Sequence, residues 1–240
     1  MYLCGVNWNI IHLDEIDSTN CWLKEHGEGD MVVWADFQTA GRGCGTNTWE
    51  SERGKNLLFS VLLHPQNLHA SRQFSIPAMV SVALCEILEK RLNGQRVEIK
   101  WPNDIYVNGR KIAGILIENT LQGNTVKNSI VGIGLNVNQK DFKGDAPNPV
   151  SLFHLTGQEI NRETLLHECL HGLKVPFKEE NIFLSFKERC FLKGKEAVYE
   201  DSYGRFKATI TNVEPDGRLV MTDEDGQERR YAFKEVKFIL

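Results

Sequence analysis

Three cations and the carboxylate of Asp104 flank a tight turn within residues 100–118, KWPNDIYVNGRKIAGILIE. Asn108 and Gly109 separate two strand-like runs, and this dipeptide is the strongest short signal for a β-hairpin because both residues readily adopt positive φ. The strand that leaves the turn then fixes the direction of the Lys111 side chain. A rigid cluster of cations of this kind predicts a site for anions.

A second candidate for anion binding is the polar loop of residues 38–51, QTAGRGCGTNTWES. Its glycines allow the backbone to approach a ligand closely, and Arg42 supplies a cation. The loop is not a Walker A motif, which requires Gly-x-x-x-x-Gly-Lys-Ser/Thr, and a dinucleotide-binding fingerprint would need glycine at position 46, where the chain has Thr46. Alone, the loop fits a ligand-binding role and a plain flexible loop equally well.

Strands and helices alternate through the first 190 residues. We expect strands at 9–16, 31–37, 56–63, 97–100, 105–107, 111–117 and 129–137, and helices at 18–26, capped by Ser18 or Thr19, and at 74–92. A Pro-containing loop at 145–150 and helices at 162–175 and 181–192 follow the sheet. From residue 194 onward, short strands at 196–199, 205–213, 218–222 and 228–233 predict a small all-β unit.

Composition is that of an ordinary globular protein: 240 residues, 41% hydrophobic, 25% charged and a net charge of −4. These values suit one large domain, alone or with a small module, and a net acidic chain lacks the basic surface typical of nucleic-acid binders. The N-terminus does not resemble a signal peptide, and no apolar run approaches about 18 residues, so we expect a cytoplasmic protein with no membrane partner. The six scattered cysteines form no CxxC pair and are expected to be reduced and mostly buried.

The motif H-E-x-x-H, formed by His167, Glu168 and His171, offers a competing chemistry. On a helix, two histidines one turn apart can bind zinc while the glutamate acts as a base, as in zinc proteases. The apolar residues around the motif suggest a core-packed helix instead, and no downstream Gly-x-x-His extends it. We therefore consider a metalloprotease the weaker interpretation.

Four segments together resemble the biotin protein ligase family, in order and in spacing. They are Asp17-Ser18-Thr19-Asn20, the Gly41-Arg42-Gly43 loop with Trp49 downstream, residues 100–116, and residues 132–138, GIGLNVN. The resemblance covers essentially the whole chain. It implies an α/β (α+β) catalytic domain at residues 1–190, with a mixed β-sheet flanked by helices, followed by a small SH3-like β-barrel at residues 191–240.

The resemblance also implies an activity. Family members activate biotin with ATP to biotinyl-5′-AMP, releasing pyrophosphate, and transfer the biotinyl group to a lysine of a carrier domain. By resemblance, Lys111 contacts the biotin carboxylate and the α-phosphate, Arg42 closes over the intermediate, and Asp104 holds Mg²⁺ on the triphosphate. The acceptor lysine must also lose a proton before it attacks, and Asp104 is the candidate to assist that step.

The remaining site residues are assigned by the same resemblance. Biotin would be bound by Ser18, Thr19, Asn20, Gln38, Gly41, Arg42, Gly43, Cys44, Lys111, Gly114 and Gly132. ATP or the adenylate would be bound by Trp49, Lys100, Asn103, Lys111 and Asn136, with Trp49 stacking on adenine and Asn136 reading its edge.

The implied partner is the biotin carboxyl carrier protein or domain of a biotin-dependent carboxylase or decarboxylase. The ligase-like sequence starts almost at Met1, so we expect no winged-helix domain in front of it and no DNA partner. Homodimerisation through the sheet edge is left open. Two alternatives remain: a lipoate or octanoate protein ligase or transferase, and a binding module with an inactive ligase domain.

The chain departs from the family pattern in the loop. Many relatives have Arg or Gln and then Arg-Gly after Gly-Arg-Gly, where this chain has Cys44, Gly45 and Thr46. With less charge and more glycine, the loop is expected to release biotinyl-adenylate faster than a basic loop would. Cys44 is expected to be exposed and to be the first thiol modified by an alkylating reagent.

Overall fold

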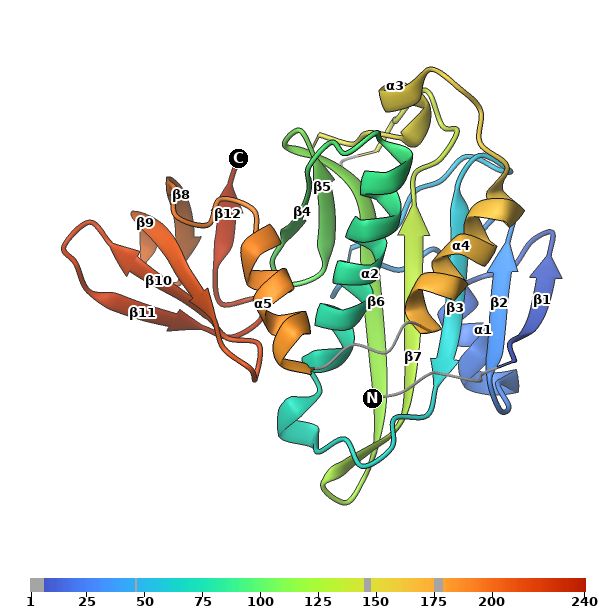
Figure 1. Ribbon diagram of the computed structural model, residues 1–240, viewed down its shortest axis with the longest axis horizontal. Coiled ribbons are helices and arrows are strands. Elements are labelled where there is room, and N and C mark those ends of the chain that lie inside the picture. Colours follow the sequence, from blue (N-terminus) through green and yellow to red (C-terminus); the bar gives the residue numbers. More distant parts are fainter. Residues whose placement is uncertain (1–6, 46, 145–147, 175–178) are drawn as a thin grey trace.

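The computed structural model describes residues 7–45, 47–144, 148–174 and 179–240 and contains two β-sheets that lie side by side (Figure 1). The first sheet has the strand order β1-β2-β3-β7-β6-β5-β4. Its strands are β1 (Asn9–Leu13), β2 (Met31–Ala35), β3 (Leu57–Leu63), β4 (Val97–Lys100), β5 (Asp104–Val107), β6 (Arg110–Gln122) and β7 (Thr125–Leu135). Strands β1 and β2 are parallel and the other neighbours are antiparallel, so the sheet is mixed, as expected.

Helices cover both faces of this sheet. One face carries α2 (Ser75–Arg91), α4 (Arg162–Lys174) and α5 (Glu179–Arg189), and the other carries α1 (Thr19–His26) (Figure 1). Residues of β2 alternate between the two sides: Val32 and Trp34 join the large core under α2, whereas Met31 and Val33 pack with Leu23 of α1. This period of two is what a strand buried on both faces requires.

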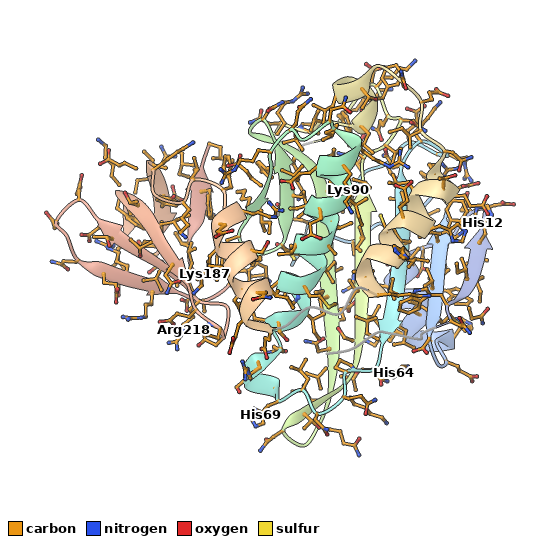
Figure 2. The ribbon with its side chains drawn as sticks, viewed as in Figure 1. His12, His64, His69, Lys90, Lys187 and Arg218 are labelled. Atoms are coloured by element: carbon orange, nitrogen blue, oxygen red, sulfur yellow. The ribbon has the colours of Figure 1, made fainter. Side chains whose placement is uncertain are left out.

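The longest helix, α2, ends in the basic residues Lys90 and Arg91. Cations there interact favourably with the negative end of the helix dipole. Figure 2 shows Lys90 at this end of α2, and its side chain is exposed. The rest of the helix is almost entirely buried, so α2 is the central support of the sheet rather than an amphipathic surface helix.

The second sheet is antiparallel, with the order β11-β10-β9-β8-β12. Its strands are β8 (Glu196–Asp201), β9 (Gly204–Val213), β10 (Leu219–Asp223), β11 (Glu228–Tyr231) and β12 (Lys237–Ile239). Its apolar side chains join the core of the first sheet, and Trp101 Nε1 donates a 2.9 Å hydrogen bond to the Gly217 carbonyl oxygen. The small all-β unit predicted from the sequence is therefore present and docked on the first sheet.

Several boundaries differ from the predictions. The expected strand 9–16 ends at Leu13, and Ile16 forms an isolated bridge with Gln38. The short helix α3 (Leu152–Thr156) and the three-residue strand β12 were not predicted, because each is too short to show a periodic pattern. Of the predicted segments, part of the loop 145–150, the end of helix 162–175 and Thr46 lie outside the described residues.

Within the ranges that the structure describes, every helix is too short or too polar to cross a lipid bilayer.

Candidate functional site

A cavity of about 400 Å³ lies on the α1 face of the first sheet, where the loop after β2 and the turn before β12 meet. Most of the predicted site residues line it. They are Ser18, Thr19, Asn20, Gln38, Arg42, Gly43, Cys44, Trp49, Lys100, Asn103, Asp104, Lys111, Gly114 and Gly132. Segments far apart in the sequence thus come together around a single space, as the four motifs predicted.

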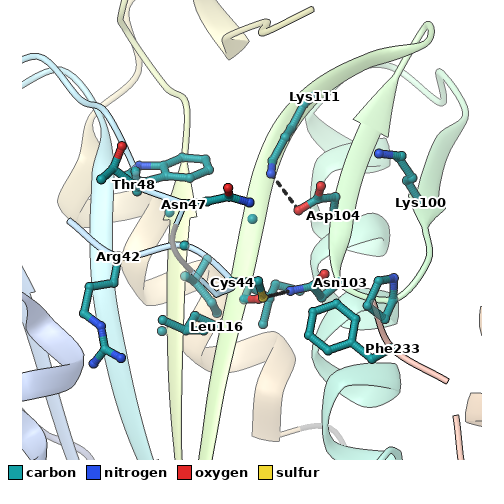
Figure 3. Close-up of a pocket in the computed structure, with 18 of the residues that line it drawn as sticks. Arg42, Cys44, Asn47, Thr48, Lys100, Asn103, Asp104, Lys111, Leu116 and Phe233 are labelled. Carbon is teal, nitrogen blue, oxygen red and sulfur yellow. Dashed lines mark hydrogen bonds and ion pairs between the residues drawn. The ribbon is translucent and has the colours of Figure 1, made fainter. Parts of the chain in front are cut away.

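At one end of the cavity, Lys111 Nζ lies 2.7 Å from Asp104 Oδ1 (Figure 3). The hairpin turn that carries Lys111 has φ of 51° at Asn108 and 72° at Gly109, both in the left-handed region that a type I′ turn requires. The predicted hairpin is confirmed. The ion pair is partly open to solvent, because the two side chains are 21% and 22% exposed.

A β-bulge explains how both Lys111 and Gly114 reach the cavity. Residues three apart in a regular strand point to opposite faces. Here Lys111 pairs with Tyr106 and Gly114 pairs with Asp104, two residues apart on β5, because the register shifts between them. The two residues in between, Ile112 and Ala113, are both buried in the core. Nothing in the sequence signals this bulge, and without it one of the two cavity residues would face the core.

At the other end of the cavity, four polar side chains form a connected network. Gln38 Oε1 accepts hydrogen bonds from the Thr19 backbone N–H at 2.7 Å and from its hydroxyl at 3.0 Å. Gln38 thereby satisfies an N-terminal amide of α1, whereas the Ser18 side chain, predicted as a cap, makes no capping hydrogen bond. Ser60, which the sequence did not single out, lies with its Oγ 2.7 Å from Thr19 Oγ1 and 2.6 Å from Asn20 Oδ1.

Glycines on β6 and β7 make room for the side chains around the cavity. A Cβ atom at Gly132 would overlap Asn20 Oδ1, one at Gly134 would overlap the indole of Trp49, and one at Gly114 would lie 2.9 Å from Trp49 Cζ3. Trp49 therefore lies flat against the sheet. Its Nε1–H is buried and has no hydrogen-bond partner among the described residues. Gly134 was not predicted as a site residue.

The loop after β2 holds Arg42 away from Lys111. Arg42 Nη1 lies 3.4 Å from Glu118 Oε1, and Glu118 Oε2 accepts a 2.9 Å hydrogen bond from Asn20 Nδ2. In Figure 3, Arg42 points away from the Lys111–Asp104 pair. Arg42 lines the cavity but is not in contact with the other predicted catalytic residues in this structure.

Cys44 is not the exposed thiol that we predicted. It is half-buried in the cavity wall, and its Sγ accepts a 3.0 Å hydrogen bond from Asn103 Nδ2. Burial raises the pKa of the Cys44 thiol, although Asn103 and the ammonium groups of Lys111 and Lys234 act in the opposite direction. The loop folds back over the sheet, and the sequence carried no signal for that contact.

We therefore expect Cys44 to react with iodoacetamide at neutral pH more slowly than a cysteine in an unstructured peptide. The reagent attacks the thiolate, and a raised pKa lowers the thiolate fraction at any pH below it. Peptide mapping by mass spectrometry after timed labelling measures this rate. Modification of Cys44 as fast as the peptide cysteine would contradict the described environment.

The second sheet contributes residues that the sequence did not predict. Phe233, Lys234, Val236, Lys237 and Phe238 line the cavity opposite the loop. Lys100 faces them, with its Nζ 5.1 Å from the centre of the Phe238 ring, and burial lowers the pKa of the Lys100 ammonium. Among the described residues that line the cavity, five are cations, including Arg42, and one is a carboxylate, so the cavity favours a strongly anionic ligand.

Two predicted site residues do not line the cavity. Gly41 is buried next to it, with its carbonyl oxygen accepting from the Trp49 backbone N–H at 2.9 Å. Asn136 is buried, and its Nδ2 donates a 3.1 Å hydrogen bond to the Val150 carbonyl oxygen. This bond uses one of the two Nδ2 hydrogens, so the contact of Asn136 with adenine stays a prediction.

The H-E-x-x-H motif lies on α4, away from the cavity. Glu168 forms a double hydrogen bond with Arg91, at 2.7 Å and 2.6 Å, while His167 and His171 are exposed. The bidentate pair with Arg91 gives Glu168 a structural role, because it links α4 to the end of α2. The apolar residues of α4 pack on α2, so the prediction of a core-packed helix is confirmed.

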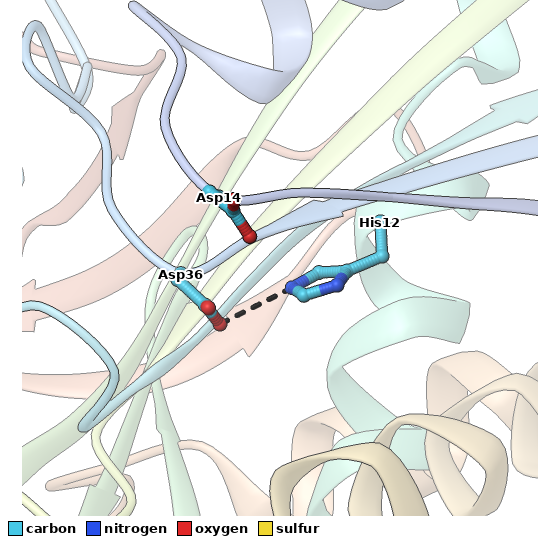
Figure 4. A group of neighbouring side chains, drawn as sticks. All are labelled: His12, Asp14 and Asp36. Atoms are coloured by element: carbon cyan, nitrogen blue, oxygen red, sulfur yellow. Dashed lines mark ion pairs between the residues drawn. The ribbon is translucent and has the colours of Figure 1, made fainter.

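His12, Asp14 and Asp36 form a group of close potential metal ligands at the end of β1 and β2 (Figure 4). Asp36 Oδ1 lies 3.2 Å from His12 Nε2 and also accepts a 2.8 Å hydrogen bond from Arg162. Burial acts to raise the pKa of the Asp36 carboxyl, but these hydrogen bonds outweigh it and lower the pKa. Within this group, the pair between Asp36 and Arg162 ties α4 to the sheet.

Comparison with known proteins identifies the family. The family model of the Biotin/lipoate A/B protein ligase family matches residues 13–136. The chain belongs to this family. The matched region includes every predicted site residue and ends before the second sheet.

Individual members of the family are similar to this chain over more than the matched region. The bifunctional ligase/repressor BirA of Bacillus spizizenii is 29% identical, over 93% of this chain and 72% of that protein. A biotin–[acetyl-CoA-carboxylase] ligase of Paracoccus denitrificans is 36% identical, over 64% of this chain and 67% of that protein. The structure of the biotin protein ligase from Aquifex aeolicus in complex with biotin and ATP superimposes with a TM-score of 0.80 at 26% identity, covering 96% of this chain and 99% of that one. This match includes the second sheet.

Proposed function

We propose that the chain is a biotin–protein ligase. It activates biotin with ATP to biotinyl-5′-AMP and pyrophosphate, and then transfers the biotinyl group to a lysine of a biotin carboxyl carrier domain. The observation that carries the proposal is a single cavity with a polar network of Thr19, Asn20 and Gln38 at one end and the Lys111–Asp104 pair at the other. The first end suits a ureido ring, which has one strong acceptor and two donors, and the second suits a carboxylate meeting a phosphate.

Adenylate formation brings the biotin carboxylate against the α-phosphate of ATP. Two unit charges 4 Å apart repel by about 1 kcal/mol in water and by about 4 kcal/mol at an effective dielectric constant near 20. Lys111 offsets this repulsion from a rigid hairpin, and Arg42 adds a second cation once it leaves Glu118. Lys100 and Asn103 line the same end of the cavity and would contact the phosphates, and Trp49 offers its indole to adenine.

Asp104 fits the role of a magnesium ligand. Mg²⁺ prefers oxygen ligands and is usually held by one or two carboxylates together with substrate phosphates, and Asp104 is the one carboxylate among the described lining residues. When bound there, Mg²⁺ would neutralise the triphosphate. Lys111 would then exchange its contact with Asp104 for the carboxylate and α-phosphate of the substrates.

The proposal extends to the organisation of the chain and its partners. Residues 1–190 form the catalytic domain, and residues 191–240 form the SH3-like barrel. The acceptor is the carrier domain of a biotin-dependent carboxylase or decarboxylase. The reaction takes place in the cytoplasm. The net charge of −4 supports a role without DNA. Strand β1 lies at the edge of the first sheet, where a second copy could pair in a homodimer.

The direct test is pyrophosphate exchange into ATP, measured in parallel with biotin, lipoate and octanoate. We expect exchange that depends on biotin and on Mg²⁺. Exchange supported by lipoate or octanoate instead would establish the other branch of the family. No exchange with any acid would leave a binding module with an inactive ligase domain.

Replacing Gly134 with alanine is expected to raise the KM for ATP by about tenfold, the size expected from loss of one base–aromatic stack. The added Cβ atom would overlap the Trp49 indole and push it off the sheet. The affinity for biotin should change little, because the network around Gln38 does not involve Trp49. Ala113→Gly, a substitution of a buried residue on the neighbouring strand β6, is the control. It should destabilise the fold without displacing Trp49, so it shows how much the KM for ATP changes through destabilisation alone. Gly109→Ala is unsuitable because the φ of Gly109 is positive. Equal KM values for ATP in Gly134→Ala and the wild type would contradict the placement of adenine.

Replacing Cys44 with arginine is expected to slow the dissociation of biotinyl-5′-AMP, because it restores a cation to the loop that closes over the intermediate. Release of radiolabelled adenylate in the presence of excess unlabelled biotin and ATP measures the rate. Equal rates for the wild type and Cys44→Arg would refute the expectation that this loop retains the adenylate poorly.

A further inference from the structure

Lys234, in the turn between β11 and β12, lies next to the uncharged part of the loop after β2. A Cβ atom placed on Gly45 would lie 3.1 Å from Lys234 Nζ and 3.4 Å from Lys234 Cε. The ammonium group of Lys234 therefore lies directly over Gly45, beside Cys44. These two residues have no charge of their own, and Arg42, the cation of this loop, is paired with Glu118.

The backbone of Lys234 has an unusual conformation for a lysine. Its φ is +71°, in the left-handed region that glycine adopts readily and that residues with a Cβ atom adopt at a cost in free energy. Strained positions of this kind cluster at ligand-binding sites, where the rest of the structure enforces them. The presence of lysine at a position that favours glycine therefore suggests that its side chain has a function.

The turn that carries Lys234 is held firmly against the first sheet. Phe233 packs its ring edge-on against Trp101, with the ring centres 6.5 Å apart. The turn is closed by a 3.2 Å hydrogen bond from the Glu235 N–H to the Ala232 carbonyl oxygen. The position of Lys234 over the loop thus follows from the docking of the two sheets.

The ammonium group of Lys234 is also free to bind an anion. The neighbouring carboxylate of Glu235 accepts a 2.7 Å hydrogen bond from the Ala232 N–H, and within the described residues Lys234 forms no ion pair. Its side chain lies at the exposed rim of the cavity, on the same wall as Lys237. A phosphate in the cavity would therefore meet Lys234 on one side and Lys111 on the other.

We propose that Lys234 is an adenylate-binding residue. From the turn before β12, it supplies the positive charge that the loop lacks at Cys44 and Gly45, and it retains the phosphate of the acyl adenylate until transfer. The inference rests on the proposed ligase function. It assigns to the C-terminal sheet a direct part in holding the intermediate. Position 45 is glycine for a separate reason, because its φ of +72° lies in the left-handed region that glycine adopts readily.

The test compares Lys234→Gly with the wild type in the full-length chain. Glycine removes the charge and relieves the strained φ, so we expect a melting temperature raised by a few degrees. The same variant should release biotinyl-5′-AMP about tenfold faster, the loss expected for one hydrogen bond to a charged group. Biotin affinity measured without ATP should stay unchanged, because biotin has no phosphate.

Three further variants make the test specific. Lys234→Arg should release the adenylate at nearly the wild-type rate, and Cys44→Arg combined with Lys234→Gly should restore slow release by returning a cation to the loop. Lys207→Met removes an exposed lysine of the second sheet that is paired with Glu196, and it should leave the rate of adenylate release unchanged. This control accounts for the change in net charge.

Two results would overturn the inference. One is adenylate release from Lys234→Gly within about twofold of the wild-type rate; the other is an equal acceleration by Lys207→Met. Failure of the ligase function itself is recognised separately, because the wild-type protein would then form no biotinyl-5′-AMP from biotin and ATP.

Discussion

Replacing Lys111 with methionine should lower the rate of biotin-dependent adenylate formation by about two to three orders of magnitude, the usual effect of removing one group that stabilises developing charge. Methionine keeps most of the length of the side chain but leaves the carboxylate and the α-phosphate without their shared cation. The loss of the 2.7 Å pair with Asp104 should affect stability little, because both side chains are partly solvated. Pyrophosphate exchange and thermal unfolding measure the two effects separately.

Lys127→Met is a suitable control for this prediction. Lys127 lies exposed on β7 of the same sheet and does not line the cavity. Its replacement should leave the exchange rate unchanged. A Lys111→Met protein that is folded and exchanges pyrophosphate within about fivefold of the wild-type rate would remove Lys111 from the catalytic step.

Replacing Asp104 with alanine should have the second large effect, because two steps depend on this carboxylate in the proposed mechanism. Adenylate formation should fall by about a hundredfold or more, and added Mg²⁺ should restore only part of it. Transfer also needs a base, since an acceptor lysine with a pKa of about 10.4 is neutral in only about four molecules per ten thousand at pH 7. Asp104 is the one carboxylate among the described lining residues, so transfer should slow as well.

Single-turnover transfer from preformed biotinyl-5′-AMP separates the two roles. The adenylate is added directly, so the metal-dependent first step does not contribute. If Asp104→Ala transfers biotin to the carrier domain at the wild-type rate, Asp104 is not the base, and its role is confined to adenylation.

Much of the catalytic sheet could be predicted from the sequence because its signals are local. The Asn108-Gly109 turn is specified by two adjacent residues, and the buried strands and α2 are long apolar runs. The resemblance of the four motifs to the family named about half of the described residues that line the cavity. The register shift on β6 was not predictable, because a bulge depends on how two strands pair and not on the residues of one of them.

The contribution of the second sheet could not be predicted for a different reason. Lys234 reaches Gly45 through contacts between segments almost 190 residues apart in the chain, and nothing in either segment signals the other. The environment of Cys44 was mispredicted for the same reason: a glycine-rich loop is expected to be exposed, yet Asn103 and the docked second sheet enclose it. The Ser60 hydroxyl was missed because it lies within a continuous apolar strand.

The most direct test of the account is biotin transfer to a carrier domain, followed by mass spectrometry of the intact acceptor. With the purified chain, biotin, ATP and Mg²⁺, we predict that a biotin carboxyl carrier domain gains one biotinyl group on a single lysine, and that lipoate in place of biotin gives no product. A carrier domain that stays unmodified in the presence of biotin, or that gains a lipoyl group instead, would contradict the assignment of this chain as a biotin–protein ligase.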